Sequence, residues 1–114
     1  MVGLSAVADA RIPTHLEVGG LIRAVQAAGG FATVIAKGER DAGTLMLVLS
    51  ERGAPARAFE RMPQADGTRR WSLSRAQDMD DPRAFWDWCD RRHRQDSDLW
   101  VLEIDVANAE RFIA

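Results

Sequence analysis

The residues best equipped for chemistry gather where a helical pattern gives way to the last extended segment. In chain order they are Arg92, Asp96, Asp98 and Trp100. An arginine fork beside two carboxylates and an indole could bind a small polar ligand or the charged tail of a partner protein. The same group could equally form a structural clasp that fixes the turn. We therefore name these four residues as the candidate binding site and keep both interpretations open.

Residues suited to covalent catalysis are sparse. The chain has two histidines, His15 and His93, and a single cysteine, Cys89. Cys89 falls on the apolar face of a predicted helix, where a thiol usually packs as a small hydrophobe. The glycine-bearing segment 38–43 lacks the ending of a phosphate-binding loop, and it joins two predicted strands. The sequence therefore favours a protein that is not an enzyme.

Metal ligands are equally sparse. No group of cysteines and histidines has the spacing of a zinc site. Asp78, Asp80 and Asp81 form an acidic patch, but the patch lacks the glycine and the terminal glutamate of a calcium loop. It also suits the start of a helix. We expect neither a metal nor a cofactor.

A basic run at residues 91–94 raises the question of nucleic-acid binding. Helical spacing pairs Arg91 with Asp87 and Arg94 with Asp90, each as an i,i+4 ion pair in the favourable order. The formal net charge of the chain is −2, whereas phosphate recognition normally needs a basic excess. Both observations argue against a nucleic-acid partner.

The elements that must position these residues follow from hydrophobic periodicity. Thr14 and Glu17 have the spacing of a capping box, ahead of a helix that ends at Gly29. A second helix begins at Pro82 and runs to about residue 95. We expect strands at 31–37, 44–50, 56–61, 70–74 and 98–106.

The element order α-β-β-β-β-α-β predicts an α+β fold with a mostly antiparallel sheet. The six-residue link at 38–43 suits a hairpin, so the first four strands should form a meander, and both helices should lie on one face. Strand 44–50 is apolar on both sides and should be central, whereas the polar strand 56–61 suits an edge. A stripe of small residues (Gly20, Ala24 and Ala27) could pack against the second helix or form a subunit contact.

Length and composition limit the organisation of the chain. At 114 residues, with 46% hydrophobic and 28% charged residues, it fits one globular domain. We expect a flexible leader at residues 1–12 and a single α+β domain at 13–114. Neither a signal peptide nor an apolar run of membrane-spanning length is evident. With a lone cysteine, this favours a cytoplasmic bacterial protein.

The segment at 91–105 carries a family resemblance. Its sequence RRHRQDSDLWVLEID resembles the signature of the family called domain of unknown function 1491, whose members are short, mostly alphaproteobacterial proteins. The stretches GGFA at 29–32 and KG at 37–38 are similar too, and the likeness extends over about residues 12–112. Ser97 stands where the family more often carries proline. The resemblance supports one cytoplasmic domain and implies no biochemical activity.

Three classes of function follow from these observations. The favoured class is a non-catalytic interaction or adaptor domain that could form a homodimer. The alternative is a small-molecule-binding or enzymatic domain that uses the corner of Arg92, Asp96, Asp98 and Trp100. Nucleic-acid binding ranks third, and a membrane partner is not expected.

Overall fold

The computed structural model describes residues 12–114, so residues 1–11 of the expected leader lie outside the described residues. Within these residues two α-helices, five strands and a short 3₁₀ helix follow one another in the predicted order, which confirms the α+β class. In chain order they are α2 (Thr14–Ala27), β1 (Phe31–Ala36), β2 (Leu45–Ser50), β3 (Arg57–Pro63), β4 (Arg69–Ala76), α3 (Pro82–Gln95), β5 (Trp100–Asp105) and η1 (Ala109–Ile113).

The strands form one sheet in the order β1-β5-β2-β3-β4. The sheet is mostly antiparallel, as predicted, and β5 runs parallel to β2. The predicted hairpin between β1 and β2 is wrong, because β5 lies between these two strands and pairs with both. The link at 37–44 therefore crosses the start of β5, and β1 becomes an edge strand.

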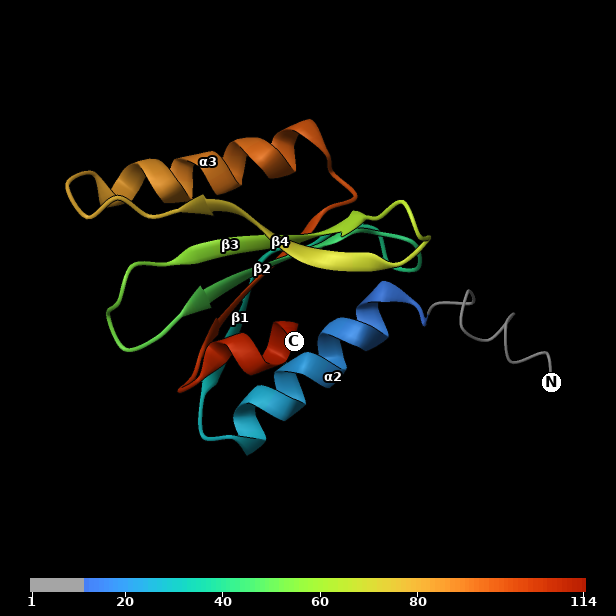
Figure 1. Ribbon diagram of the computed structural model, residues 1–114, viewed down its shortest axis with the longest axis horizontal. Helices are drawn as coiled ribbons and strands as arrows, with labels where there is room; N and C mark the ends of the chain where they lie inside the picture. Colours follow the sequence, from blue (N-terminus) through green and yellow to red (C-terminus); the bar gives the residue numbers. More distant parts are fainter. Residues whose placement is uncertain (1–11) are drawn as a thin grey trace, which may run out of the picture.

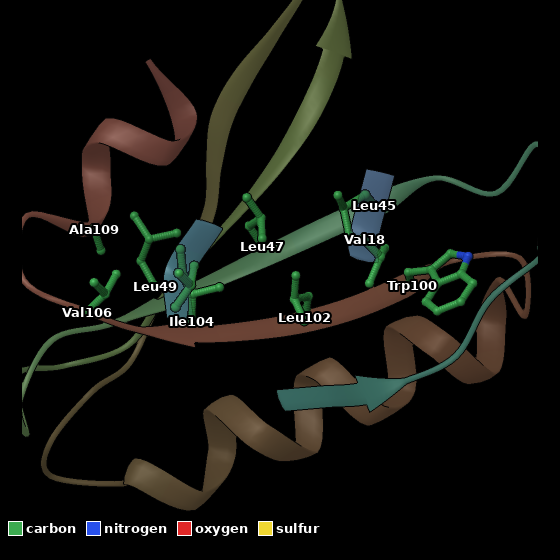
Figure 2. Packing of buried hydrophobic residues seen from close by; sticks show 10 residues of the cluster. Val18, Leu45, Leu47, Leu49, Trp100, Leu102, Ile104, Val106 and Ala109 are labelled. Atoms are coloured by element: carbon green, nitrogen blue, oxygen red, sulfur yellow. The ribbon is translucent and has the colours of Figure 1, made fainter. Parts of the chain in front are cut away.

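The two helices cover opposite faces of the sheet, so the expectation of one shared face is wrong (Figure 1). The reason lies in β2 and the first half of β5, whose side chains are apolar on both faces and need a cover on each. One buried cluster, on what we call the α2 face, joins Val18, Val25, Leu45, Leu47, Leu49, Trp100, Leu102, Ile104, Val106 and Ala109 (Figure 2). The α3 face holds Met46, Val48, Ala56, Ala58, Phe85, Cys89, Leu99 and Val101.

Strand β2 is central, as predicted, and its residues from Leu45 to Leu49 are all buried. The prediction that the third strand is an edge is wrong, because β4 pairs along its outer side. The polar residues of β3 face the helices instead of solvent. Glu60 forms an ion pair with Arg92 of α3, and Arg61 forms one with Glu17 of α2. Charge in this strand therefore reflects pairing with the helices.

The loop that crosses β5 is fixed by close backbone contacts. A Cβ atom on Gly38 would lie 2.2 Å from the carbonyl oxygen of Asp98, and one on Gly43 would lie 2.5 Å from the same oxygen. Thr14 is buried and its hydroxyl donates to the carbonyl of Gly43 at 2.7 Å. The predicted capping box is therefore wrong: Thr14 binds the crossing loop, and Glu17 pairs with β3. None of the helices within residues 12–114 is long and apolar enough to cross a membrane.

Candidate functional site

The four predicted site residues lie in two different places. Trp100 is 4% exposed in the cluster on the α2 face, and its indole Nε1 donates to the carbonyl oxygen of Glu39 at 2.7 Å. Asp98 is exposed, and its carbonyl accepts the N–H of Glu39 at 3.1 Å. These two residues hold the crossing loop onto β5.

Arg92 and Asp96 lie together on the other side of the corner. The guanidinium of Arg92 forms an ion pair with Glu60 of β3, and a carboxylate oxygen of Asp96 accepts the N–H of Asp98 at 3.1 Å. Arg92 and Asp96 also line a common hollow of about 200 Å³. The structure thus brings two of the four predicted residues to one hollow and uses the other two elsewhere.

A second hollow, of about 230 Å³, lies against the first, and both share Arg61 and Arg69. Arg61 binds Glu17 with two hydrogen bonds of 2.6 and 2.8 Å, and its guanidinium lies 4.9 Å from the ring centre of Trp71. Its Nε is buried without a hydrogen-bond partner. The wall of the first hollow consists of Thr44, Leu45, Glu60, Arg61, Met62, Arg69, Arg92 and Asp96. A ligand would compete there with the carboxylates of Glu17 and Glu60.

The thiol of Cys89 is closed to solvent. Cys89 is 1% exposed between α3 and the sheet, and this burial raises the pKa of its thiol to about 12. A protonated, enclosed thiol is inert at neutral pH, which agrees with its predicted role in the core. His93 is half-buried, and its Nδ1 lies 2.8 Å from the carbonyl oxygen of Leu99. Across residues 12–114 no three His, Cys, Asp or Glu side chains gather closely enough to hold a metal ion.

The feature that sequence reasoning missed is the outer edge of β1. Its sequence FATVIA contains no charge, and Phe31, Val34 and Ile35 are exposed to 76%, 40% and 43%. The opposite edge of the sheet, β4, carries Arg69, Arg70 and Arg75 in the sequence RRWSLSRA. Charged side chains protect an edge strand from pairing with another chain. Only one of the two edges, β4, has this protection.

The register of β1 on β5 assigns its side chains to faces. Phe31 and Thr33 pair with Asp105 and Glu103. These two residues of β5 lie four and two positions after Val101 and share its face, so Phe31 and Thr33 both lie on the α3 face. The register shifts between Val34 and Ala36, and no partner on β5 faces Ile35. Such a bulge places two residues opposite one, here Ile35 and Ala36 opposite Val101.

The small-residue stripe of α2 does not contact the second helix, since α3 lies on the other face of the sheet. Ala24 and Ala27 are exposed, and Gly20 is partly exposed. The first interpretation of the stripe is therefore wrong. A subunit contact through it stays a prediction.

Comparison with known proteins gives a family and a fold. The family model described as "Protein of unknown function (DUF1491)" matches residues 12–114. A crystal structure of a DUF1491 family protein from Caulobacter crescentus CB15 is similar, with a TM-score of 0.76 and 32% identity over 91% of this chain and 96% of that one. The solution structure of protein Atu0922 from A. tumefaciens has a TM-score of 0.69 and 29% identity over 90% and 92% of the two chains. No curated protein matches the chain.

Proposed function

The chain belongs to the DUF1491 family, proteins of unknown function, and we propose that it is a non-catalytic interaction domain whose docking element is the edge strand β1. In this mode an extended segment of a partner adds a strand to the sheet, and backbone hydrogen bonds supply most of the affinity. We also place the protein in the bacterial cytoplasm, a proposal supported by the bacterial sources of the similar structures and by its single thiol.

The observation that carries the proposal is the difference between the two edges of one sheet. Among residues 12–114 no strand pairs with the outer side of β1, which carries Phe31, Val34 and Ile35 and no charged side chain. In β4, three arginines oppose the approach of another strand. If the sheet had no docking role, we would expect both edges to be protected in a similar way.

The state of the side chains best suited to chemistry also supports a role in binding. Cys89 is enclosed and protonated, His93 contacts the Leu99 carbonyl, and Trp100 is held by Glu39. Each of these side chains has a structural partner in the fold. Within the part of the chain that the structure describes, the apolar side chains of β1 are exposed on its outer side.

Selection of short peptides on the immobilised, dilute protein tests this function. A random octapeptide library should yield uncharged, β-branched sequences that bind as extended strands. Their binding should disappear in the variant Val34→Lys and persist in the matched variant Leu73→Lys, which changes an exposed apolar residue of the other edge strand. Selection of no peptide, or of peptides equally sensitive to both substitutions, would contradict the proposal.

A second candidate function is binding of a small acidic ligand in the hollow lined by Arg92 and Asp96. The specific observation in its favour is the Nε of Arg61, a buried donor without a partner next to that hollow. A panel of metabolites, read as shifts in melting temperature, tests it. A ligand that stabilises the wild type and not Arg92→Ala would support it, and a panel without any shift would contradict it.

A further inference from the structure

The partner strand can be identified more closely if β1 is the docking element, and this step rests on the proposed function. We infer that β1 pairs with β1 of a second copy, antiparallel about a two-fold axis through Thr33. Phe31 of one copy then lies opposite Ile35 of the other, and Lys37 reaches the end of the other copy's α2.

The composition of β1 makes the strand compatible with itself. A two-fold axis pairs the strand with an identical strand, so any charge in it would come near a like charge on the other copy and destabilise the pair. The sequence FATVIA has no charge to repel. The same operation on β4 would bring Arg70 and Arg75 towards a second set of arginines.

The face of the sheet on which each side chain lies restricts the register of the strand pair. A slip by one residue would place side chains of the α3 face opposite those of the α2 face, so only registers two residues apart are allowed. With Thr33 on the axis, Thr33 meets Thr33 and Phe31 meets Ile35, while Ala32 meets Val34 on the α2 face. Pairs of threonines, and of an aromatic with a β-branched residue, are the favourable cross-strand pairs.

This register also covers the two most exposed apolar side chains of β1. Phe31 is 76% exposed and Ile35 is 43% exposed, and each occurs twice in the paired strands. The bulge leaves Ile35 without a partner on β5, next to Ala36, which packs on the α3-face cluster. Ile35 is therefore placed to meet a side chain from outside the chain.

Charge complementarity supports the same arrangement. Lys37 is the only lysine of the chain, and in this register it extends past Phe31 of the other copy towards Gly29. A hollow of about 200 Å³ lies at that point, with Gly29, Phe31, Arg52 and Asp105 in its wall. The last turn of α2, which ends beside it, carries no basic side chain. A cation is favoured at a helix C-terminus and beside the Asp105 carboxylate, which accepts the backbone N–H of Arg52 at 3.2 Å.

The extent of the contact predicts a reversible dimer. Pairing of one strand from each copy buries less area than a standard stable interface, and such small interfaces are weak or transient. We therefore expect the mass measured by light scattering to rise with concentration from the chain mass of 12.6 kDa towards twice that value. Replacement of Lys37 by glutamine, Lys37→Gln, should weaken the dimer about three- to thirty-fold, the effect of two lost contacts with a helix end.

Disulfide trapping tests the register. The native cysteine, Cys89, is buried, so it should not cross-link and any disulfide should come from the introduced cysteines. Under mild oxidation Thr33→Cys should cross-link to itself far faster than Leu73→Cys on the other edge strand, because axial pairs lie within disulfide reach. An equal mixture of Phe31→Cys and Ile35→Cys should cross-link between the two variants, whereas neither variant should do so alone.

The other outcomes separate the two proposals. Fastest cross-linking by Val34→Cys or Ala32→Cys would overturn the register. A monomer at all concentrations, with no cross-link at any of these positions, would overturn the inference of a second copy. If that monomer still binds selected peptides through β1, the proposed function stands without the dimer; if it binds none, both fall.

Discussion

The indole Nε1 of Trp100 donates a 2.7 Å hydrogen bond to the carbonyl oxygen of Glu39 and so ties the start of β5 to the loop that crosses it. The N–H of Glu39 in turn donates to the carbonyl of Asp98 at 3.1 Å. This pair of contacts holds the loop between β1 and β2 across the end of a third strand. It therefore helps to keep β5 inside the sheet and β1 at its edge.

Removal of the indole donor should destabilise the fold without blocking the outer side of β1. In Trp100→Phe the buried Glu39 contact is lost while an aromatic ring remains, so we expect the free energy of unfolding to fall by about 1–3 kcal/mol. Urea denaturation measures the change. Unchanged stability would mean that the crossing loop does not depend on this bond.

The close approach of the loop to β5 predicts a strong effect at Gly38. A Cβ atom there would overlap the Asp98 carbonyl oxygen at 2.2 Å, and this oxygen belongs to the backbone, which cannot move aside as a flexible side chain can. Gly38→Ala should therefore cost about 1–3 kcal/mol or prevent folding. The matched control is Gly19→Ala in α2, where the nearest atom is the flexible Arg23 side chain at 3.4 Å. That substitution should stabilise the protein by up to about 1 kcal/mol. Thermal melts of the two variants that shift in the same direction would contradict this account of the loop.

The ion pair between Arg92 and Glu60 predicts that Arg92 is structural. Both side chains are less than one third exposed, and Glu60 also accepts the hydroxyl of Ser74 at 2.7 Å. Arg92→Ala leaves the Glu60 carboxylate without its cation, so the variant should lose about 1–3 kcal/mol of stability. Combining it with Glu60→Gln should recover part of that loss. Additive losses in urea denaturation would show that the pair is not coupled.

The buried thiol predicts a loss of stability in alkali. The pKa of Cys89 rises from 9.0 to about 12 on folding, because burial disfavours the thiolate. Above the unfolded pKa the unfolded chain releases this proton and the folded chain keeps it. The contribution is thus present in full below pH 9.0 and is lost as the pH rises towards 12. Urea midpoints at about pH 8 and about pH 10 should fall less in Cys89→Ala than in the wild type. Equal falls would show that Cys89 does not titrate as described.

Local patterns in the sequence predict the elements well, because each depends on neighbouring residues. Proline at 82 marks the start of α3, and alternation along β5 assigns Trp100, Leu102 and Ile104 to one face, as the structure confirms. Strand order depends on contacts between distant residues. The link at 38–43 fits a hairpin by length and glycine content, and its passage over Asp98 has no local signature.

The candidate site was harder to predict, because it too depends on contacts between residues that are distant in the sequence. Arg92 was expected to join Asp98, yet its partner is Glu60, which is 32 residues away in the sequence. Trp100 points to the face away from Arg92, as its own alternation with Val101 implied. The lack of charge in β1 is visible in the sequence. Its meaning appears only when β1 is known to be an edge and β4, with its arginines, the other.

Amide hydrogen exchange across a dilution series tests the central claim, that β1 is the edge that docks a second copy, most directly. If β1 accepts a strand from a second copy, the outward N–H groups of residues 31–35 should exchange more slowly as the protein concentration rises, while those of β4 keep a constant rate. Val34→Lys should abolish this dependence. The contradicting result is a sample whose average molecular mass rises with concentration while its β1 amides exchange at a constant rate. That result would place the interface elsewhere.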